Sequence, residues 1–352
     1  MILSVIRRIG IGLLGVGMFG FAYPATAFDC APSGSDSEPP QIIFDTDFGG
    51  DADDLGAIAM LHHYADRDML DLRAIISWSH EEYAMPALAA VNRYYGRPRL
   101  PLAVRKSEIW RTEWNYTKPI ADRFPHDRQA LQDVLWAVPL YRQILAEASA
   151  HEITIVTVGP LANIRDLLES GPDENSPLSG KALVDEKVRC LVVMGGQFPD
   201  GRTASGAEWN FDGNMPGVTQ AVLENIDRPI IFSGYEVGEA LKVGKELNDH
   251  PKTTPLYEGY LHFSEYAPWI KDQFRGEILD NSSFDQTAVM FAALPDSDRF
   301  WSLSPRGKLR ADTGGMATWE PDPDGNHRYL ILDGDRHAAE AEILSAMTHI
   351  PG

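Results

Sequence analysis

Residues 41–58 read QIIFDTDFGGDADDLGAI, and this stretch decides the fold. Its apolar start, Ile42–Phe44, predicts a short buried strand. Five aspartates follow between positions 45 and 54, and apolar residues then recur at helical spacing, at Ala57, Met60, Leu61, Tyr64 and Ala65. The acidic residues therefore occupy a turn that leaves the carboxyl end of a strand and enters a helix. Open α/β sheets bind their ligands at such turns.

The density of negative charge in this turn favours a bound cation. Neighbouring carboxylates raise one another's pKa values, and a hard cation such as Ca²⁺, with about six to eight oxygen ligands, removes that cost. Gly49 and Gly50 allow the chain to curl and aim several side chains inward. A solvated acidic helix cap is the simpler alternative, but caps use one or two acids rather than five. An EF-hand loop is excluded, because two of its ligand positions would be Gly49 and Gly56.

Short apolar strands alternate with helical patterns along the rest of the chain. The alternation predicts a single α/β domain with an open, mostly parallel Rossmann-like sheet and helices on both faces. Residues 107–127 carry aromatic side chains without periodicity, and we expect a surface insertion there. The expected strands are 72–77, 153–158, 188–194, 229–233 and 328–332, and the expected helices lie near 83–95, 128–149, 161–169, 216–225, 284–294 and 336–347.

The amino terminus has the organisation of an export signal. Arg7 and Arg8 precede an apolar run from Ile9 to Phe21, and residues 25–27 (ATA) offer a cleavage site. We therefore expect a periplasmic or secreted protein that is not attached to the membrane after cleavage. The expected parts are a signal peptide at 1–27, a linker at 28–40 and one domain at 41–350.

Acidic residues outnumber basic ones by 51 to 31, which gives a formal net charge of −20. Such an excess argues against nucleic acids and anionic membranes as partners and leaves a small-molecule substrate open. A homo-oligomer is compatible with this composition. An exported protein could pair its two cysteines, Cys30 and Cys190, but Cys190 lies within an apolar strand and is expected to be a small buried residue.

Two further junctions between a strand and a helix carry candidate residues. The segment ITIVTVGPLAN at 153–163 ends a strand at Val158, and Pro160 suits a first helical turn. In SSFDQTAV at 282–289, Ser283 is a predicted helix N-cap, which places Asp285 in the first turn.

A third segment brings polar groups to the end of another strand. The sequence VVMGG at 192–196 is followed by AEWN at 207–210. Glu208 and Asn210, two residues apart in an expected extended segment, should point to the same side. Sugar hydroxyls need acceptors and donors held in this way. Met194 alone would be interpreted as a core residue.

Together these segments resemble the inosine-uridine preferring nucleoside hydrolases over roughly residues 41–293. The first segment carries the family's Asp45-Thr46-Asp47, Gly49 and Asp53-Asp54, and the others are similar to its G-P-L-x-N, M-G-G … E-x-N and late-helix aspartate motifs. The chain departs from the family at three places. About two extra residues precede the paired aspartates and include Asp51, Arg202 replaces a frequent asparagine, and Phe284 replaces the usual histidine.

The resemblance implies a calcium-dependent N-ribohydrolase of the secreted bacterial branch, which cleaves nucleosides to ribose and free base. One Ca²⁺ would be held by Asp47, Asp54, the carbonyl of Val158 and Asp285, and Asp47 would also be the general base. Because Phe284 cannot protonate a leaving base, we expect stacking to hold it, which favours purines. The implied substrate-binding residues are Asp53, Met194, Glu208, Asn210, Trp78 and Phe284, with Trp209 as a further aromatic beside the site.

Two other functions remain open. A haloacid-dehalogenase-type phosphatase also opens with D-x-D after a strand, but it would have a hydroxyl residue near Phe48 and Gly49 and a downstream lysine. A non-catalytic periplasmic nucleoside- or sugar-binding protein on the same fold is the alternative of a different class. Asp47 favours the hydrolase, because a binding protein needs no base beside the metal.

Overall fold

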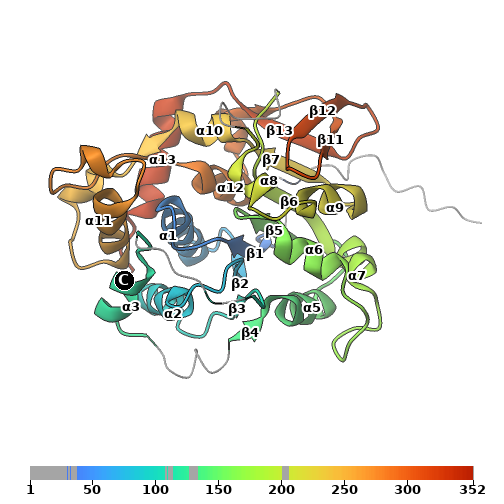
Figure 1. Cartoon of the computed structure of the whole chain (residues 1–352), viewed down its shortest axis with the longest axis horizontal. Helices are drawn as coiled ribbons and strands as arrows, with labels where there is room; N and C mark the ends of the chain where they lie inside the picture. Colours follow the sequence, from blue (N-terminus) through green and yellow to red (C-terminus); the bar gives the residue numbers. More distant parts are fainter. Residues whose placement is uncertain are drawn as a thin grey trace, which may run out of the picture.

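A large mixed sheet forms the centre of the computed structural model (Figure 1). The structure describes residues 30, 32, 38–107, 109, 114–126, 134–199 and 206–351. In this part of the chain eleven strands form one sheet in the order β12-β11-β13-β7-β6-β5-β1-β2-β3-β4, with β10 also paired to β13. Every neighbouring pair from β4 to β13 is parallel, whereas β10, β11 and β12 pair antiparallel. The predicted open, mostly parallel sheet is therefore confirmed.

The order of the strands reverses beside β1. From β1 the chain builds β2, β3 and β4 towards one edge, and it then returns to place β5, β6 and β7 on the other side of β1. A crevice opens outside the carboxyl ends of the strands at such a switch point, and ligands bind there. The strands are β1 (Gln41–Thr46), β2 (Asp71–Ser77), β3 (Leu102–Val104), β4 (Leu135–Trp136), β5 (Ile153–Thr157), β6 (Val188–Met194), β7 (Ile230–Ser233), β10 (Trp301–Leu303), β11 (Gly307–Ala311), β12 (Ala317–Pro321) and β13 (His327–Leu332), with β8 (Lys242–Val243) and β9 (Asn281–Ser282) in a separate two-stranded sheet.

Helices cover both faces of the sheet (Figure 1). Side chains alternate along a strand, so Ile42 and Phe44 of β1 belong to one core cluster and Ile43 to the other. Helices α1, α2, α12 and α13 pack in the first cluster, and α5, α6, α7 and α9 in the second. The helices are α1 (Asp53–Asp66), α2 (Ala84–Tyr94), α3 (Thr117–Arg123), α5 (Ala137–Glu147), α6 (Ala162–Leu168), α7 (Gly180–Lys187), α8 (Trp209–Asp212), α9 (Val218–Asn225), α10 (Tyr235–Ala240), α11 (Pro255–Tyr266), α12 (Phe284–Ala293) and α13 (Arg336–Met347), with 3₁₀ turns at Lys245–Asp249, Lys271–Gln273 and Ser297–Arg299.

The expected elements agree closely with the observed ones where the apolar pattern is long. Each of the five later strands lies within one residue of its prediction, and α13 and β6 match without any shift. The helix expected at 128–149 begins only at Ala137, and residues 127–133 lie outside the described part. The surface insertion expected at 107–127 is wrong for Tyr116 and Ile120, which are fully buried in the first core cluster. Helices α7 and α11 and the short strands β3 and β4 were not predicted.

The predicted signal peptide and most of the predicted linker lie outside the described residues. No helix in the described ranges is long and apolar enough to cross a bilayer. Cys30 and Cys190 are both buried in the first core cluster and form no disulfide, so Cys190 is the small buried residue that its strand predicted.

Candidate active site

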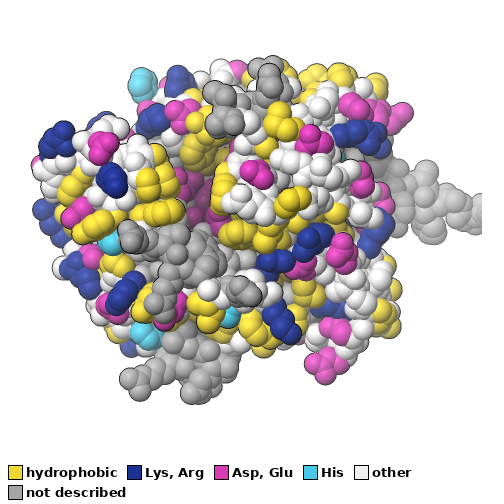
Figure 2. Space-filling view, in the orientation of Figure 1, with side chains coloured by type: hydrophobic (Ala, Val, Ile, Leu, Met, Phe, Trp, Pro, Cys, Tyr) yellow, Lys and Arg dark blue, Asp and Glu magenta, His cyan; other side chains and the backbone are white. Residues whose placement is uncertain are grey.

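An acidic hollow opens at the switch point. Figure 2 shows acidic side chains at the bottom of a depression in this face, between walls rich in hydrophobic side chains. The depression lies where Figure 1 places the start of α1, α12 and the end of β1. We define the acidic hollow by its carboxylates, which belong to Asp47, Asp51, Asp53, Asp54 and Asp285.

Three of these carboxylates form a compact, buried group. Asp53 and Asp54 are the first two residues of α1, and Asp285 is the second residue of α12. One oxygen from each lies within 4.8 Å of the others, and each residue is at most 3% exposed. Burial raises the pKa of all three well above the usual value, and the charges of neighbouring aspartates raise it further. Three buried carboxylates at this spacing could hold a hard cation, which would remove the repulsion.

Local contacts hold the start of α1 without an ordinary cap. Ala52 at the N-cap makes no side-chain capping bond. Instead the hydroxyl of Thr46 donates to Asp54, and the carboxylate of Asp53 accepts from the backbone N–H of Asp54 at 3.1 Å. One helical turn later Gly56 admits α12, because a Cβ there would lie 2.5 Å from Nε2 of Gln286. The two helices that carry the group of three therefore pack closely at that point.

Asp47 lies beside this group rather than within it. It is half-buried, and burial raises its pKa to about 7, while the indole N–H of Trp209 donates to its Oδ2 at 3.4 Å and lowers the pKa. A Cβ at Gly159 would lie 2.9 Å from the backbone nitrogen of Asp47, so the β5–α6 junction touches Asp47 only because residue 159 is glycine. Among the four predicted ligands, Asp54 and Asp285 fall in the group of three, which contains Asp53 where Asp47 was expected.

The carbonyl of Val158 faces the same region but has a protein partner. It accepts a hydrogen bond of 2.8 Å from the side-chain amide of Asn210. The same amide donates to the carbonyl of Met194 at 3.2 Å. Val158, Met194 and Asn210 are thus brought together by hydrogen bonds among themselves.

The expected extended geometry of Glu208 and Asn210 is wrong. Glu208 is the N-cap of α8 and accepts from the backbone N–H of Asn210 at 3.0 Å and of Gly196 at 2.9 Å. Asn210 is therefore a helical residue, and Gly213, whose φ of 49° suits glycine, is the C-cap of α8. Burial raises the pKa of Glu208 to about 7. A spacing of two residues fits an N-cap and its helix as well as a strand, which is why sequence reasoning failed here.

The predicted aromatic residues occupy different surroundings. Trp209 is 51% exposed beside Asp47, and the ring of Phe284 stacks on Tyr235 with centroids 5.1 Å apart. Trp78 packs against the second core cluster instead, and its buried indole nitrogen has no hydrogen-bond partner among the described residues. Ser283 is the N-cap of α12 as predicted, although its side chain makes no capping bond.

Several residues around the hollow were not among the predicted site residues. Asp45, fully buried beneath the loop, accepts from Tyr141 at 2.7 Å and Asn163 at 3.0 Å, and burial raises its pKa to about 7. Asn281 donates to Asp51 at 2.5 Å. Asn163 belongs to the G-P-L-x-N segment and could have been found there, whereas Tyr141 and Asn281 carry no motif. Arg202 lies outside the described residues.

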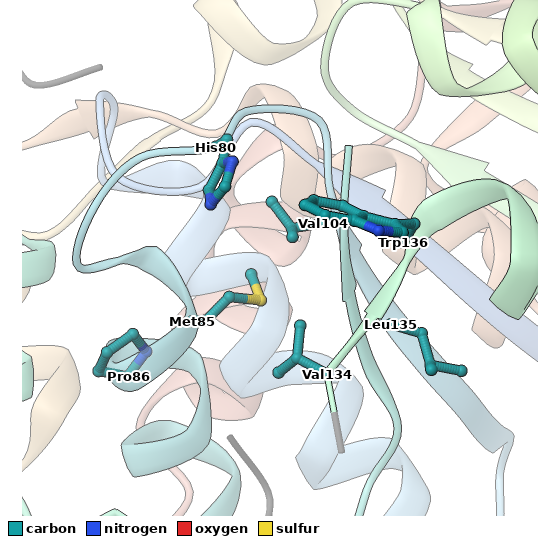
Figure 3. Close-up of a pocket in the computed structure, with 7 residues that line it drawn as sticks. All are labelled: His80, Met85, Pro86, Val104, Val134, Leu135 and Trp136. Carbon is teal, nitrogen blue, oxygen red and sulfur yellow. The ribbon is translucent and has the colours of Figure 1, made fainter. Parts of the chain in front are cut away.

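A second hollow of about 370 Å³ opens at the same edge of the sheet (Figure 3). His80 points into it from the loop after β2, and its ring meets that of Trp136 edge-on at 5.8 Å. Nδ1 of His80 lies 3.2 Å from the carbonyl of Ser107. The lining is otherwise apolar, and we call it the apolar hollow: His80, Met85, Pro86, Val104, Val134, Leu135 and Trp136.

An open α/β sheet with buried carboxylates at its switch point is typical of proteins that bind a small ligand at the strand ends, and three of these carboxylates could hold a cation. The family is narrower than that class. The chain matches the sequence profile described as inosine-uridine preferring nucleoside hydrolase over residues 42–298, and it belongs to this family.

Solved structures with the same fold include a plant nucleoside hydrolase, PpNRh1, with a TM-score of 0.63 and 17% identity, covering 88% of this chain and 99% of the other. An inosine-guanosine nucleoside hydrolase gives a TM-score of 0.61 at 17% identity, covering 89% and 100%. The type III effector XopQ, complexed with adenosine diphosphate ribose, gives 0.57 at 15% identity, covering 89% and 93%. No curated protein matched in sequence.

Proposed function

We propose that this protein is an N-ribohydrolase that splits the N-glycosidic bond of nucleosides with the help of one calcium ion. The observation that carries the proposal is the buried group Asp53, Asp54 and Asp285 beside Asp47 at the switch point. Membership of the nucleoside hydrolase family supports the same activity.

The donor set fits calcium by its chemistry. All three groups are carboxylates, which hard cations prefer, and none of them is a soft ligand. Asp54 and Asp285 would hold the ion from two different helices, with Asp53 next to them. When bound, calcium supplies positive charge that lowers the pKa of a coordinated water and orients the hydroxyls of the sugar.

The other side chains around the acidic hollow have different roles in the proposed reaction. Asp47 takes the proton from the attacking water, because its carboxylate lies at the rim of the group and is only half-buried. Asp53 and Glu208 accept hydrogen bonds from the sugar. Asn210 holds the carbonyls of Val158 and Met194 in place beneath the sugar.

Departure of the base is the step for which the described residues of the acidic hollow offer no obvious proton donor. Phe284 stacks on Tyr235, and Trp209 exposes its indole beside Asp47. Flat aromatic surfaces of this kind hold a planar base, and a purine offers the larger face. We therefore propose a preference for purine nucleosides.

A non-catalytic binding protein is the second candidate, and one observation favours it. The fold is shared with an effector protein that was solved in complex with adenosine diphosphate ribose. Under either function we propose export of the mature protein, as the amino-terminal sequence predicts, with a small molecule as the partner.

A panel of nucleosides tests the proposal. Purified protein is incubated with inosine, guanosine, adenosine, uridine and cytidine, and the release of reducing sugar is followed with chelator and with added calcium. We expect release that chelation stops and calcium restores. Tight binding of nucleosides in calorimetry without any release would establish the binding protein and refute the hydrolase.

A further inference from the structure

One hydrogen bond joins the two segments that supply the group of three carboxylates. Asp51 lies two residues before Asp53, and Asn281 lies four residues before Asp285. The side-chain amide of Asn281 donates to Oδ1 of Asp51 at 2.5 Å. Asn281 is 6% exposed, so the bond is shielded from water on that side.

Asn281 is held firmly by its own surroundings. It forms β9 with Ser282, and β9 pairs antiparallel with β8. The next residue, Ser283, donates from its backbone N–H to the carbonyls of Gly238 at 3.1 Å and Leu241 at 2.9 Å. The amide of Asn281 therefore points from a fixed support, which is the condition for a residue that orients a functional site.

Asp51 is held both by its own turn and by Asn281. It follows Gly49 and Gly50 and lies in the bend before α1, half-buried in the acidic hollow. Its carboxylate also accepts from the backbone N–H groups of Ala52 and Asp53, which belong to the same turn. The bond to Asn281 differs from these local bonds, because it ties the bend to the segment just before α12.

We propose that Asn281 is a positioning residue for the cation site, acting through Asp51. The inference rests on the proposed function. The Asn281–Asp51 bond sets the distance between the starts of α1 and α12, so that Asp53, Asp54 and Asp285 are preorganised before a cation arrives. Asp51 belongs to the extra residues that distinguish this chain from the shorter form of the motif, and its role is to receive this bond.

Calcium titration of three proteins tests the inference: wild type, Asn281→Ala, and the exchanged pair Asp51→Asn with Asn281→Asp. Loss of one charge-assisted hydrogen bond should raise the Kd for calcium about tenfold in Asn281→Ala. The exchanged pair keeps the net charge and restores an amide-to-carboxylate bond, so its Kd should return to within about threefold of wild type. Terbium bound in place of calcium should have a shorter luminescence lifetime in Asn281→Ala, because a looser site admits more water.

Asn248→Ala is the matched control. The side chain of Asn248 donates to the carbonyl of Ile278 and accepts from its backbone N–H, three residues before Asn281. Its third hydrogen bond goes to the carbonyl of Lys245, so none of these bonds involves the five aspartates. This variant should lower the melting temperature and leave the Kd for calcium unchanged. An unchanged Kd in Asn281→Ala, or no recovery in the exchanged pair, would overturn the inference. A wild type that binds no cation would overturn it together with the calcium site of the proposed function, and the wild-type titration tells these failures apart.

Discussion

The acidic hollow and the apolar hollow both open at the carboxyl ends of strands of one sheet, yet one is lined by charged side chains and the other by apolar ones. The acidic hollow lies beyond β1, a central strand with a core cluster on each face. The apolar hollow lies beyond β4, the edge strand, where Leu135 and Trp136 are 39% and 43% exposed. A buried charge interacts more strongly with a ligand than an exposed one does, because the surroundings have a lower dielectric constant. The lining of a hollow is therefore a better guide to a catalytic site than its volume.

The variant Asp47→Asn tests whether catalysis belongs to the acidic hollow, and we expect it to have the largest effect on the rate. The amide keeps the shape of the side chain and can still accept from Trp209, but it cannot take a proton. We expect kcat to fall by about 10²–10⁴-fold with the fold intact. Steady-state rates on inosine measure it, and Asp212→Asn, on the exposed side of α8, is the control that should not change. An Asp47→Asn variant with near wild-type kcat would show that the base lies elsewhere.

A change of the base in the substrate should have a smaller effect on kcat/KM. Stacking on Trp209 and Phe284 should make kcat/KM for inosine at least about tenfold higher than for uridine. Phe284→His should narrow this ratio by protonating the leaving pyrimidine. The measurement compares inosine, guanosine and uridine with a riboside whose leaving group needs no proton. Equal values for uridine and inosine in the wild type would contradict the stacking account and point to an acid outside the acidic hollow.

Stability should depend on pH in the direction set by the buried acids. The folded pKa values of Asp45 and Asp47 are raised to about 7 from an ordinary 3.8, so the folded state binds more protons than the unfolded state between these values. Without a cation the protein should therefore lose stability as pH rises from about 4 to about 7, by roughly 5 °C or more in Tm. Thermal melts in chelator across this range measure the slope. Calcium should flatten or reverse it, and a chelated protein that gains stability with rising pH would contradict the prediction.

The smallest effect is expected from the apolar hollow. His80→Ala and Trp136→Ala should change kcat/KM by less than about threefold, because the ring of His80 faces the apolar lining. Rates on inosine and uridine measure both variants. A loss beyond a hundredfold in His80→Ala alone would make His80 the missing acid and join the two hollows into one site.

An element of the fold could be predicted from the sequence where its apolar pattern is long enough to show a period. The apolar periods of the sequence predicted six strands and seven helices that the structure contains, among them the central strands β1 and β5. Strands β3 and β4 have three residues and two, too few for any period. Tyr116 was assigned to a surface insertion because its burial depends on Phe48, which its ring meets edge-on at 5.2 Å, and on the N–H of Gly49.

Among the site residues, too, those fixed by local sequence were predicted and those that depend on distant contacts were not. Asp53, Asp54 and Asp285 were found as acids at helix starts, because local sequence determines where a helix begins. The hydrogen bond between Asp51 and Asn281 could not be found, since it depends on how two distant helices pack. The geometry of Glu208 and Asn210 was mistaken because their spacing fits two local structures.

The distance along the chain between Asp51 and Asn281, 230 positions, has a consequence for the order of assembly. A polypeptide that emerges from its amino end presents Asp53 and Asp54 early, whereas α12 appears only after most of the sheet has been made. Closing so long a loop costs conformational entropy, so we expect this contact to form late in folding. We therefore expect terbium luminescence to rise only in the last phase of refolding, and a rise in the first phase would contradict this order. On this account the ion is captured by a nearly finished molecule and stabilises the end of folding rather than starting it.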